Sequence, residues 1–106
     1  MGSKKTSRDK RASLPRSHDH TREFRKDWQR LTHSGRHDMK RLKEAMMALI
    51  AGDAPLGAEW QDHALKGQWA DHRECHIGGD FLLIYLLAAD RVIFVRAGSH
   101  ADLFEE

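Results

Sequence analysis

The chain has one cysteine and no long apolar run, and both absences exclude whole classes of protein. With Cys75 as the only thiol, no disulfide can form within the chain, so it is not a disulfide-stabilised scaffold. No apolar stretch approaches the ~20 residues that a membrane-spanning helix requires. The basic N-terminus also lacks the apolar segment of a signal peptide. We therefore expect a cytoplasmic protein without membrane contacts.

Positive charge is scarce in the second half of the chain. Residues 51–106 carry 4 Lys and Arg against 10 Asp and Glu, whereas residues 1–50 carry 14 against 6. A basic half beside an acidic half is typical of a protein that binds a polyanion on one side. Solvated helix faces would produce the same imbalance, so charge alone leaves both interpretations open.

The length of 106 residues indicates one domain. Residues 1–12 are rich in Lys and Arg and contain almost nothing apolar, which predicts a basic disordered tail. Residues 13–106 are expected to form the folded domain.

Two amphipathic helices are expected in the first half of the chain. The first begins after the N-cap residue Thr21, ends at Gly35 and has an apolar stripe of Phe24, Trp28 and Leu31. The second begins near Asp38, ends at Gly52 and has an apolar stripe of Met39, Leu42, Met46, Leu49 and Ile50.

Strands dominate the second half. Residues 69–77, 81–87 and 91–96 read as three strands separated by tight turns, and residues 13–20 contain a weak signal for an edge strand. The order predicts an α+β fold, with two N-terminal helices packed on a largely antiparallel sheet of three to four strands. Cys75 alternates with His76 in the first of these strands, which predicts that the thiol faces the core.

Three segments of the second half carry recognisable motifs. Residues 62–69 read DHALKGQW, residues 73–76 and 80–85 read RECH and DFLLIY, and residues 98–104 read GSHADLF. They resemble, in order, the DHPLxGxW, RDxH…DWxLIY and GTHAxLF segments of YafQ-type toxins in the RelE/ParE superfamily. The resemblance spans about residues 22–104. Its departures are local: Ala64 replaces a proline, and Phe81 stands where tryptophan is common.

The resemblance implies a small RelE-like fold and the toxin half of a type II toxin–antitoxin pair. It further implies a ribosome-dependent mRNA endonuclease that needs no cofactor or metal. The expected partners are a cognate antitoxin protein, the 70S ribosome and mRNA. Carried over position by position, the catalytic residues of the family fall on His63, His76, Asp80, His100 and Phe104.

These residue types suit metal-independent RNA cleavage. A base must take the proton of the 2′-OH as it attacks the adjacent phosphate, and an acid must protonate the departing 5′-oxygen. Imidazole, with an ordinary pKa of about 6.5, can fill either role near neutral pH. We expect His100 to be one proton carrier and His63 or His76 to be the other. A solvent-facing or strand-end histidine is the alternative at each position.

Asp80 and Phe104 have supporting roles in this hypothesis. Asp80 could orient a histidine and fix its tautomer, or it could only serve the turn that it occupies. Phe104 could stack on a base of the RNA, or it could pack in the core.

The scarce cations of the second half are candidates for contacting phosphate. Arg96 lies close to His100 in the sequence and is the better candidate, with Arg73 the other. An ion pair with Glu74 or Asp80 is the alternative for both. Lys40 and Arg41, in the basic first turn of the second helix, are candidates for gripping ribosomal RNA, unless they form only a solvated face.

Three other functions are alternatives to RNA cleavage. His72, Glu74 and His76 would share one strand face and could bind zinc, but the chain has no HExxH motif and no second cysteine. Relatives of the ParE type block DNA gyrase, but they lack the histidine set. A non-catalytic nucleic-acid-binding module would use the basic helices alone.

Overall fold

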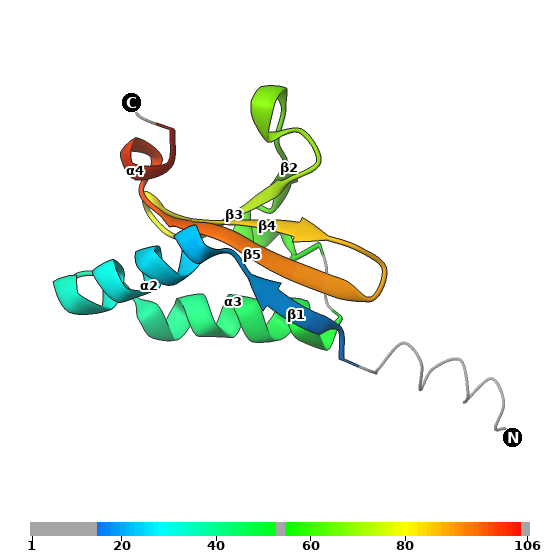
Figure 1. Cartoon of the computed structure of the whole chain (residues 1–106), viewed down its shortest axis with the longest axis horizontal. Helices are drawn as coiled ribbons and strands as arrows, with labels where there is room; N and C mark the ends of the chain where they lie inside the picture. The colour runs from blue at the N-terminus through cyan, green and yellow to red at the C-terminus, as the bar shows by residue number, and fades with distance from the viewer. Residues whose placement is uncertain (1–14, 53–54, 105–106) are drawn as a thin grey trace, which may run out of the picture.

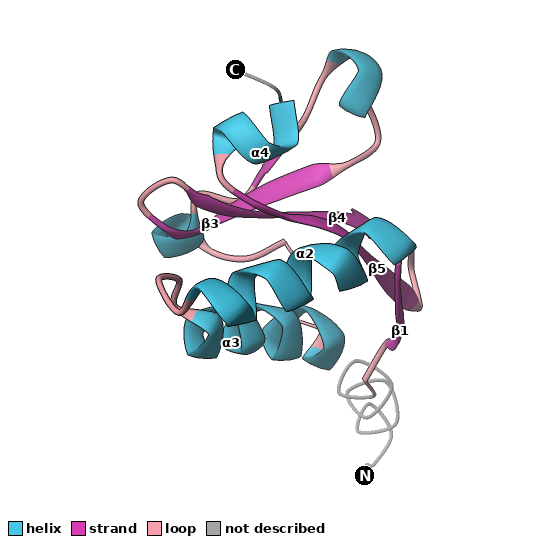
Figure 2. Cartoon of the chain, turned by 60° about the vertical axis from the view of Figure 1, so that its left-hand side comes forward, coloured by secondary structure: helices cyan, strands magenta, loops and turns pink. Residues whose placement is uncertain are grey.

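The computed structural model of the chain describes residues 15–52 and 55–104. The predicted tail, residues 1–12, lies outside the described residues. Two long helices, α2 (Arg22–Ser34) and α3 (Met39–Ala51), cover one face of a five-stranded sheet (Figure 1). A short third helix, α4 (His100–Phe104), lies on the other face (Figure 2). No described helix has the length and apolar character needed to cross a bilayer.

The sheet has the strand order β1-β5-β4-β3-β2. Its strands are β1 (Ser17–His20), β2 (His63–Ala64), β3 (Arg73–Gly78), β4 (Phe81–Leu87) and β5 (Arg91–Gly98). β1 pairs with β5 in parallel, and every other pairing is antiparallel. The predicted α+β class is therefore confirmed, with one more strand than the upper expectation.

The differences from the predicted strands are at the edges. The weak signal in residues 13–20 corresponds to β1, and no strand was predicted for the two residues of β2. The strand expected to start at Trp69 starts instead at Arg73, because Gly67–Trp69 form a 3₁₀ turn. Gly67 enters that turn at φ 67°, a left-handed conformation that glycine adopts without strain.

Both predicted helices have the expected ends. The Thr21 hydroxyl accepts a hydrogen bond from the backbone N–H of Phe24 at 2.9 Å, and the Asp38 carboxylate accepts one from Arg41 at 2.9 Å. Such side-chain caps satisfy backbone donors that have no partner within the helix. Gly35 and Gly52 end the two helices in the left-handed conformation.

The two faces of the sheet bury different apolar sets. The helix-covered face contributes Cys75, Ile77, Leu83, Tyr85, Val92, Phe94 and Ala97 to the main core. Cys75 is completely buried there, as its alternation with His76 predicted. The opposite face has a small cluster of Leu82, Ile84 and Leu103, with Trp69 and Phe104 packed against it. His76 therefore points away from the helices and toward the face on which α4 lies.

The C-terminal segment forms α4, a helix that was not predicted. Ser99 and Asp102 cap it reciprocally: the Ser99 N–H donates to the Asp102 carboxylate at 3.1 Å, and the Asp102 N–H donates to the Ser99 hydroxyl at 3.0 Å. A serine followed three residues later by an acidic residue is a known helix-start pattern. The signal was thus present in the sequence.

Candidate functional site

Three histidines from separate parts of the chain meet on the sheet face that carries α4. His63 comes from β2, His76 from β3 and His100 from the start of α4. The ring centroids of His63 and His76 lie 6.1 Å apart, and those of His76 and His100 lie 6.2 Å apart. The structure therefore brings together all three rings that the motifs singled out.

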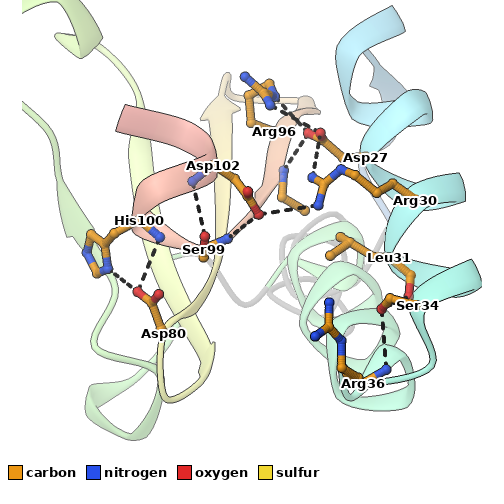
Figure 3. Close-up of polar contacts among 11 residues, drawn as sticks. Asp27, Arg30, Leu31, Ser34, Arg36, Asp80, Arg96, Ser99, His100 and Asp102 are labelled. Atoms are coloured by element: carbon orange, nitrogen blue, oxygen red, sulfur yellow. Dashed lines mark hydrogen bonds and ion pairs between the residues drawn. The ribbon is translucent and has the colours of Figure 1, made fainter. Parts of the chain in front are cut away.

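His100 is held by Asp80, which lies in the turn between β3 and β4. The imidazole Nδ1 lies 2.5 Å from the Asp80 carboxylate, and the backbone N–H of His100 donates to the same oxygen at 3.2 Å (Figure 3). These side-chain and backbone hydrogen bonds from His100 lower the pKa of Asp80. An ionised Asp80 accepts a hydrogen bond from Nδ1–H, which places the proton-accepting lone pair of the neutral ring on Nε2.

Glu74 is a site residue whose place beside the histidines was not predicted. From the sequence it was a possible zinc ligand or an ion-pair partner of an arginine. Its carboxylate is buried in β3, with the residue 4% exposed. It lies 3.5 Å from Nε2 of His63 and 3.4 Å from Nε2 of His76. A buried carboxylate normally requires such partners. The alternation of Glu74 with Cys75 was the signal that placed it on this face.

His63 is fixed through both of its ring nitrogens. Nδ1 lies 2.8 Å from the carbonyl oxygen of Gln61, and Nε2 faces Glu74. Both neighbours are acceptors, so an imidazolium form of His63 would donate to both at once. These two contacts fix the orientation of the ring.

The same residues form a group that could hold a metal ion. Ligand atoms of His63, Glu74 and His76 all lie within 4.8 Å of one another. His72, which the zinc alternative placed beside Glu74 and His76, does not belong to this group. His72 precedes β3 and its ring packs edge-on against Trp69, with 5.1 Å between centroids.

Phe104 lies beside the histidines at the end of α4. Its ring centroid is 5.9 Å from that of His100 and 5.9 Å from that of Trp69. The ring is half-buried against the cluster of Leu82, Ile84 and Leu103. It therefore packs on one side and remains accessible at its margin, so its place fits both roles weighed from the sequence.

Arg73 and Arg96 pair with carboxylates that the sequence analysis did not name. Arg73 donates to Asp62 at 2.8 Å, and Arg96 donates to Asp27 at 2.7 and 3.1 Å. The hydrogen bond to Asp27 is the main cause that raises the pKa of Arg96. The expected alternative partners, Glu74 and Asp80, face histidines instead.

Lys40 and Arg41 are not brought to the histidines. Both lie in the first turn of α3, which covers the other face of the sheet (Figure 1). Arg41 donates to the carbonyl oxygen of Ile77 at 2.8 Å, and its guanidinium lies 4.0 Å from the ring centroid of Trp60. Arg41 thus links α3 to β3 and to Trp60, whereas Lys40 is exposed.

A buried network anchors the segment that leads to His63. The Asp62 side chain is 0% exposed and accepts hydrogen bonds from the Tyr85 hydroxyl, from Arg73 and from the backbone N–H of Leu56. Burial and the hydrogen bond to Asp62 raise the pKa of Tyr85, so the phenol stays protonated and donates. Asp62 is the first residue of the motif at residues 62–69, but its buried contacts can be identified only in the folded structure.

The site consists of histidines, which can carry protons, and of carboxylates that lie beside them. His100 is paired with Asp80, and the pair of His63 and His76 is paired with Glu74. Proton donors and acceptors placed around one small surface suit acid–base catalysis on a substrate that lies between them.

Comparison with known sequences identifies relatives of this chain. The family described as bacterial toxin of type II toxin–antitoxin system, YafQ, matches residues 16–105. The mRNA interferase toxin YafQ of Escherichia coli K12 is 43% identical over 67 residues, which cover 63% of this chain and 73% of that protein. The protein of the same name from strain B / BL21-DE3 is 36% identical over 91 residues, covering 86% and 98%.

Solved structures agree with the sequence comparison. YafQ from E. coli BL21(DE3) superposes with a TM-score of 0.77 at 36% identity, over 84% of this chain and 98% of that one. The toxin in the E. coli DinJ–YafQ complex gives 0.75 at 37% identity, over 84% and 98%. A copper-bound mutant toxin from Helicobacter pylori gives 0.75 at 40% identity, over 84% and 99%.

Proposed function

Because the chain belongs to the YafQ family of toxins from type II toxin–antitoxin systems, we propose that it is an endoribonuclease that cuts mRNA on the ribosome. A cognate antitoxin protein would neutralise it, as the existence of a DinJ–YafQ complex for a relative suggests. The observation that carries the proposal is the convergence of His63, His76 and His100 beside two carboxylates.

The proposed reaction is an internal transesterification. A base removes the proton of the 2′-OH, the resulting oxygen attacks the adjacent phosphorus, and the bond from phosphorus to the 5′-oxygen breaks as an acid protonates that oxygen. The products are a 2′,3′-cyclic phosphate and a 5′-OH end. No co-reactant is needed, because the attacking group belongs to the RNA.

We assign the base to His100 and the acid to the pair of His63 and His76. Asp80 accepts a hydrogen bond from Nδ1–H of His100, which leaves the lone pair on Nε2 to receive the proton of the 2′-OH. Glu74 lies next to Nε2 of both other histidines and can accept a hydrogen bond from either ring. An imidazolium ring can give a proton to the leaving 5′-oxygen and offset negative charge on the phosphate.

The remaining site residues would hold the substrate. Phe104 would stack on a base beside the scissile bond, a contact worth ~1–3 kcal/mol. Arg96 uses Nε and Nη2 for Asp27, and we propose that Nη1 meets phosphate. Arg73 would contact a neighbouring phosphate. Lys40, exposed on α3, would contact ribosomal RNA rather than the cleaved strand.

A metal ion is not part of this proposal. A copper or zinc ion, if bound, would be held by His63, Glu74 and His76. Such an ion would occupy imidazole lone pairs that proton transfer requires. We therefore expect added copper to inhibit cleavage, and a chelator selective for copper and zinc to leave activity intact while ribosomal magnesium is retained.

The test is cleavage of a defined mRNA in a reconstituted translation reaction. Mapping of new 5′ ends should show cuts with the unmodified protein and none with His100→Ala, and ligation of the downstream fragment should require prior phosphorylation. His33→Ala, an exposed histidine on α2, is the matched control and should cut normally. Cleavage by His100→Ala at the normal rate would refute the proposal, and equal cutting of free mRNA would refute ribosome dependence.

A further inference from the structure

Arg30 links the helix layer to the helix that begins with His100. Its guanidinium donates through Nη2 to Asp27, on the same helix, at 3.1 Å, and through Nη1 to Asp102, on α4, at 3.3 Å. Figure 3 shows the arginine between the two carboxylates, which come from α2 and α4. We refer to this contact as the Arg30 bridge.

One end of the Arg30 bridge is rigidly placed. Asp27 is 4% exposed and accepts hydrogen bonds from two nitrogens of Arg96 and from the backbone N–H of Ala97 at 3.0 Å. Arg96 and Ala97 belong to β5, so the Asp27 carboxylate ties α2 to the strand that leads into α4. A buried carboxylate saturated with donors is costly to displace.

The other end of the Arg30 bridge acts on a helix that needs support. α4 has five residues, too few for an isolated helix to be stable. Within it, Leu103 is the buried residue. Asp102 both closes the first turn, by accepting the N–H of Ser99, and receives Arg30. The position of Asp102 therefore sets the position of the first turn, which contains His100.

Gly98 supports this view independently. It has φ 155°, and a Cβ atom there would lie 3.0 Å from a carboxylate oxygen of Asp102 and 3.3 Å from Nη2 of Arg30. The chain thus passes close to the contact between Arg30 and Asp102, at a position where a side chain would push the two apart.

We infer that Arg30 is a positioning residue for RNA cleavage: it holds α4 so that His100 and Phe104 face His63 and His76. This inference rests on the proposed function. Arg30 donates to Asp27 and Asp102, so its effect on His100 passes through Asp102 and the first turn of α4.

The experiment compares Arg30→Ala with Arg25→Ala in the ribosomal cleavage assay. Both variants remove one arginine from α2, so a general loss of charge affects them alike. Misplacement of a catalytic group by ~1 Å can cost on the order of 100-fold in rate. We expect Arg30→Ala to lower kcat between tenfold and 100-fold, by that reasoning, with KM equal to that of Arg25→Ala. The His100 ring resonances should shift in Arg30→Ala and stay in place in Arg25→Ala.

Two more variants complete the test. Arg30→Lys restores charge but cannot bridge two carboxylates as a guanidinium does, so its kcat should remain below normal. Arg30→Ala and Asp102→Ala should be strongly non-additive in a double-mutant cycle, because they remove the same contact. If Arg30→Ala does not fold, Arg30→Lys provides the same readouts.

The outcomes separate this inference from the proposed function. If His100→Ala is inactive while the Arg30 variants match Arg25→Ala in kcat and leave the His100 resonances unmoved, the positioning role is wrong and the proposed function stands. If His100→Ala cuts normally, the proposed function itself is wrong. Additive effects of Arg30→Ala and Asp102→Ala would also overturn the positioning role.

Discussion

The Nδ1 atom of His100 lies 2.5 Å from the carboxylate of Asp80, a residue 20 positions earlier in the chain. Asp80 lies in the turn between β3 and β4, and His100 lies where β5 leads into α4. Antiparallel pairing of β4 with β5 brings these two ends to the same edge of the sheet. The contact thus follows directly from the topology.

Asp80→Asn is expected to lower kcat by on the order of 10- to 100-fold while the protein stays folded. An asparagine can offer its amide N–H to Nδ1, which selects the wrong tautomer of His100, as an equivalent change does in a catalytic triad. Asp80 is exposed, so unfolding should not explain the loss. Cleavage kinetics and the unfolding temperature should be measured together.

The matched control is Asp90→Asn, in the exposed turn between β4 and β5. It removes the same charge away from the histidines and should keep a normal kcat. Equal kcat values for Asp80→Asn and the unmodified protein would show that the carboxylate serves only the turn.

Glu74→Gln should reduce both cleavage and metal binding. The glutamine keeps the size of the side chain but removes the negative charge beside His63 and His76. We expect copper affinity to fall, because one anionic ligand is lost, and kcat to fall, because both rings lose a charged hydrogen-bond partner. Isothermal titration with copper and the ribosomal cleavage assay measure the two effects separately.

Glu59→Gln is the control for Glu74→Gln, because Glu59 is exposed and lies in the turn before Trp60. Normal kcat together with reduced copper affinity in Glu74→Gln would assign this carboxylate to metal binding alone. Unchanged copper affinity would remove Glu74 from the ligand set.

Most of the fold was predictable because its signals are local. Thr21 and Gly35 bound α2 as expected, and the apolar run of β4 was found at its full length. The sequence-based prediction was wrong where a strand depends on partners that are distant in the sequence. The two residues of β2 are a strand only because they pair with Arg73 and Glu74.

The site was predictable from motifs to the same extent. The motifs named His63, His76, Asp80 and His100, and the structure brings them together. Long-range charge pairs carry no local signal, which is why Asp27 was not identified as the partner of Arg96, 69 residues away. Asp62 was likewise missed, because its three donors converge only in the folded chain.

Tyr85→Phe should lower the free energy of unfolding by about 1–3 kcal/mol, the range expected when a buried acceptor loses a hydrogen-bond donor. The Tyr85 hydroxyl donates to Asp62, whose side chain is fully buried. Little volume is removed, so the loss reports the hydrogen bond rather than packing. Urea unfolding followed by tryptophan fluorescence gives the value.

The comparison variant is Asp62→Asn, which keeps the shape but removes the charge that Arg73 faces. It should destabilise the fold more than Tyr85→Phe does, because it also leaves a half-buried guanidinium without its carboxylate. The reverse order of stabilities would mean that the Arg73 pair contributes nothing in this site.

Acid should release α4 before the rest of the protein unfolds. The backbone hydrogen bond from Ser99 is the main cause that lowers the pKa of Asp102 below its ordinary value of 3.8, and Asp80 is lowered from the same value by His100. A carboxyl with a lowered folded pKa stabilises the folded state above its unfolded pKa, and this contribution is lost as the pH falls through the folded value. The two groups therefore hold α4 at neutral pH and down to about pH 4, and this contribution is lost as the pH falls further.

Amide resonances of Ser99 and Leu103, followed from pH 6 to pH 2, should change while those of β4 remain in place. In Asp102→Asn the part of this transition that comes from Asp102 should disappear, since the asparagine cannot titrate. An unaltered acid transition in that variant would show that Asp102 does not hold the helix.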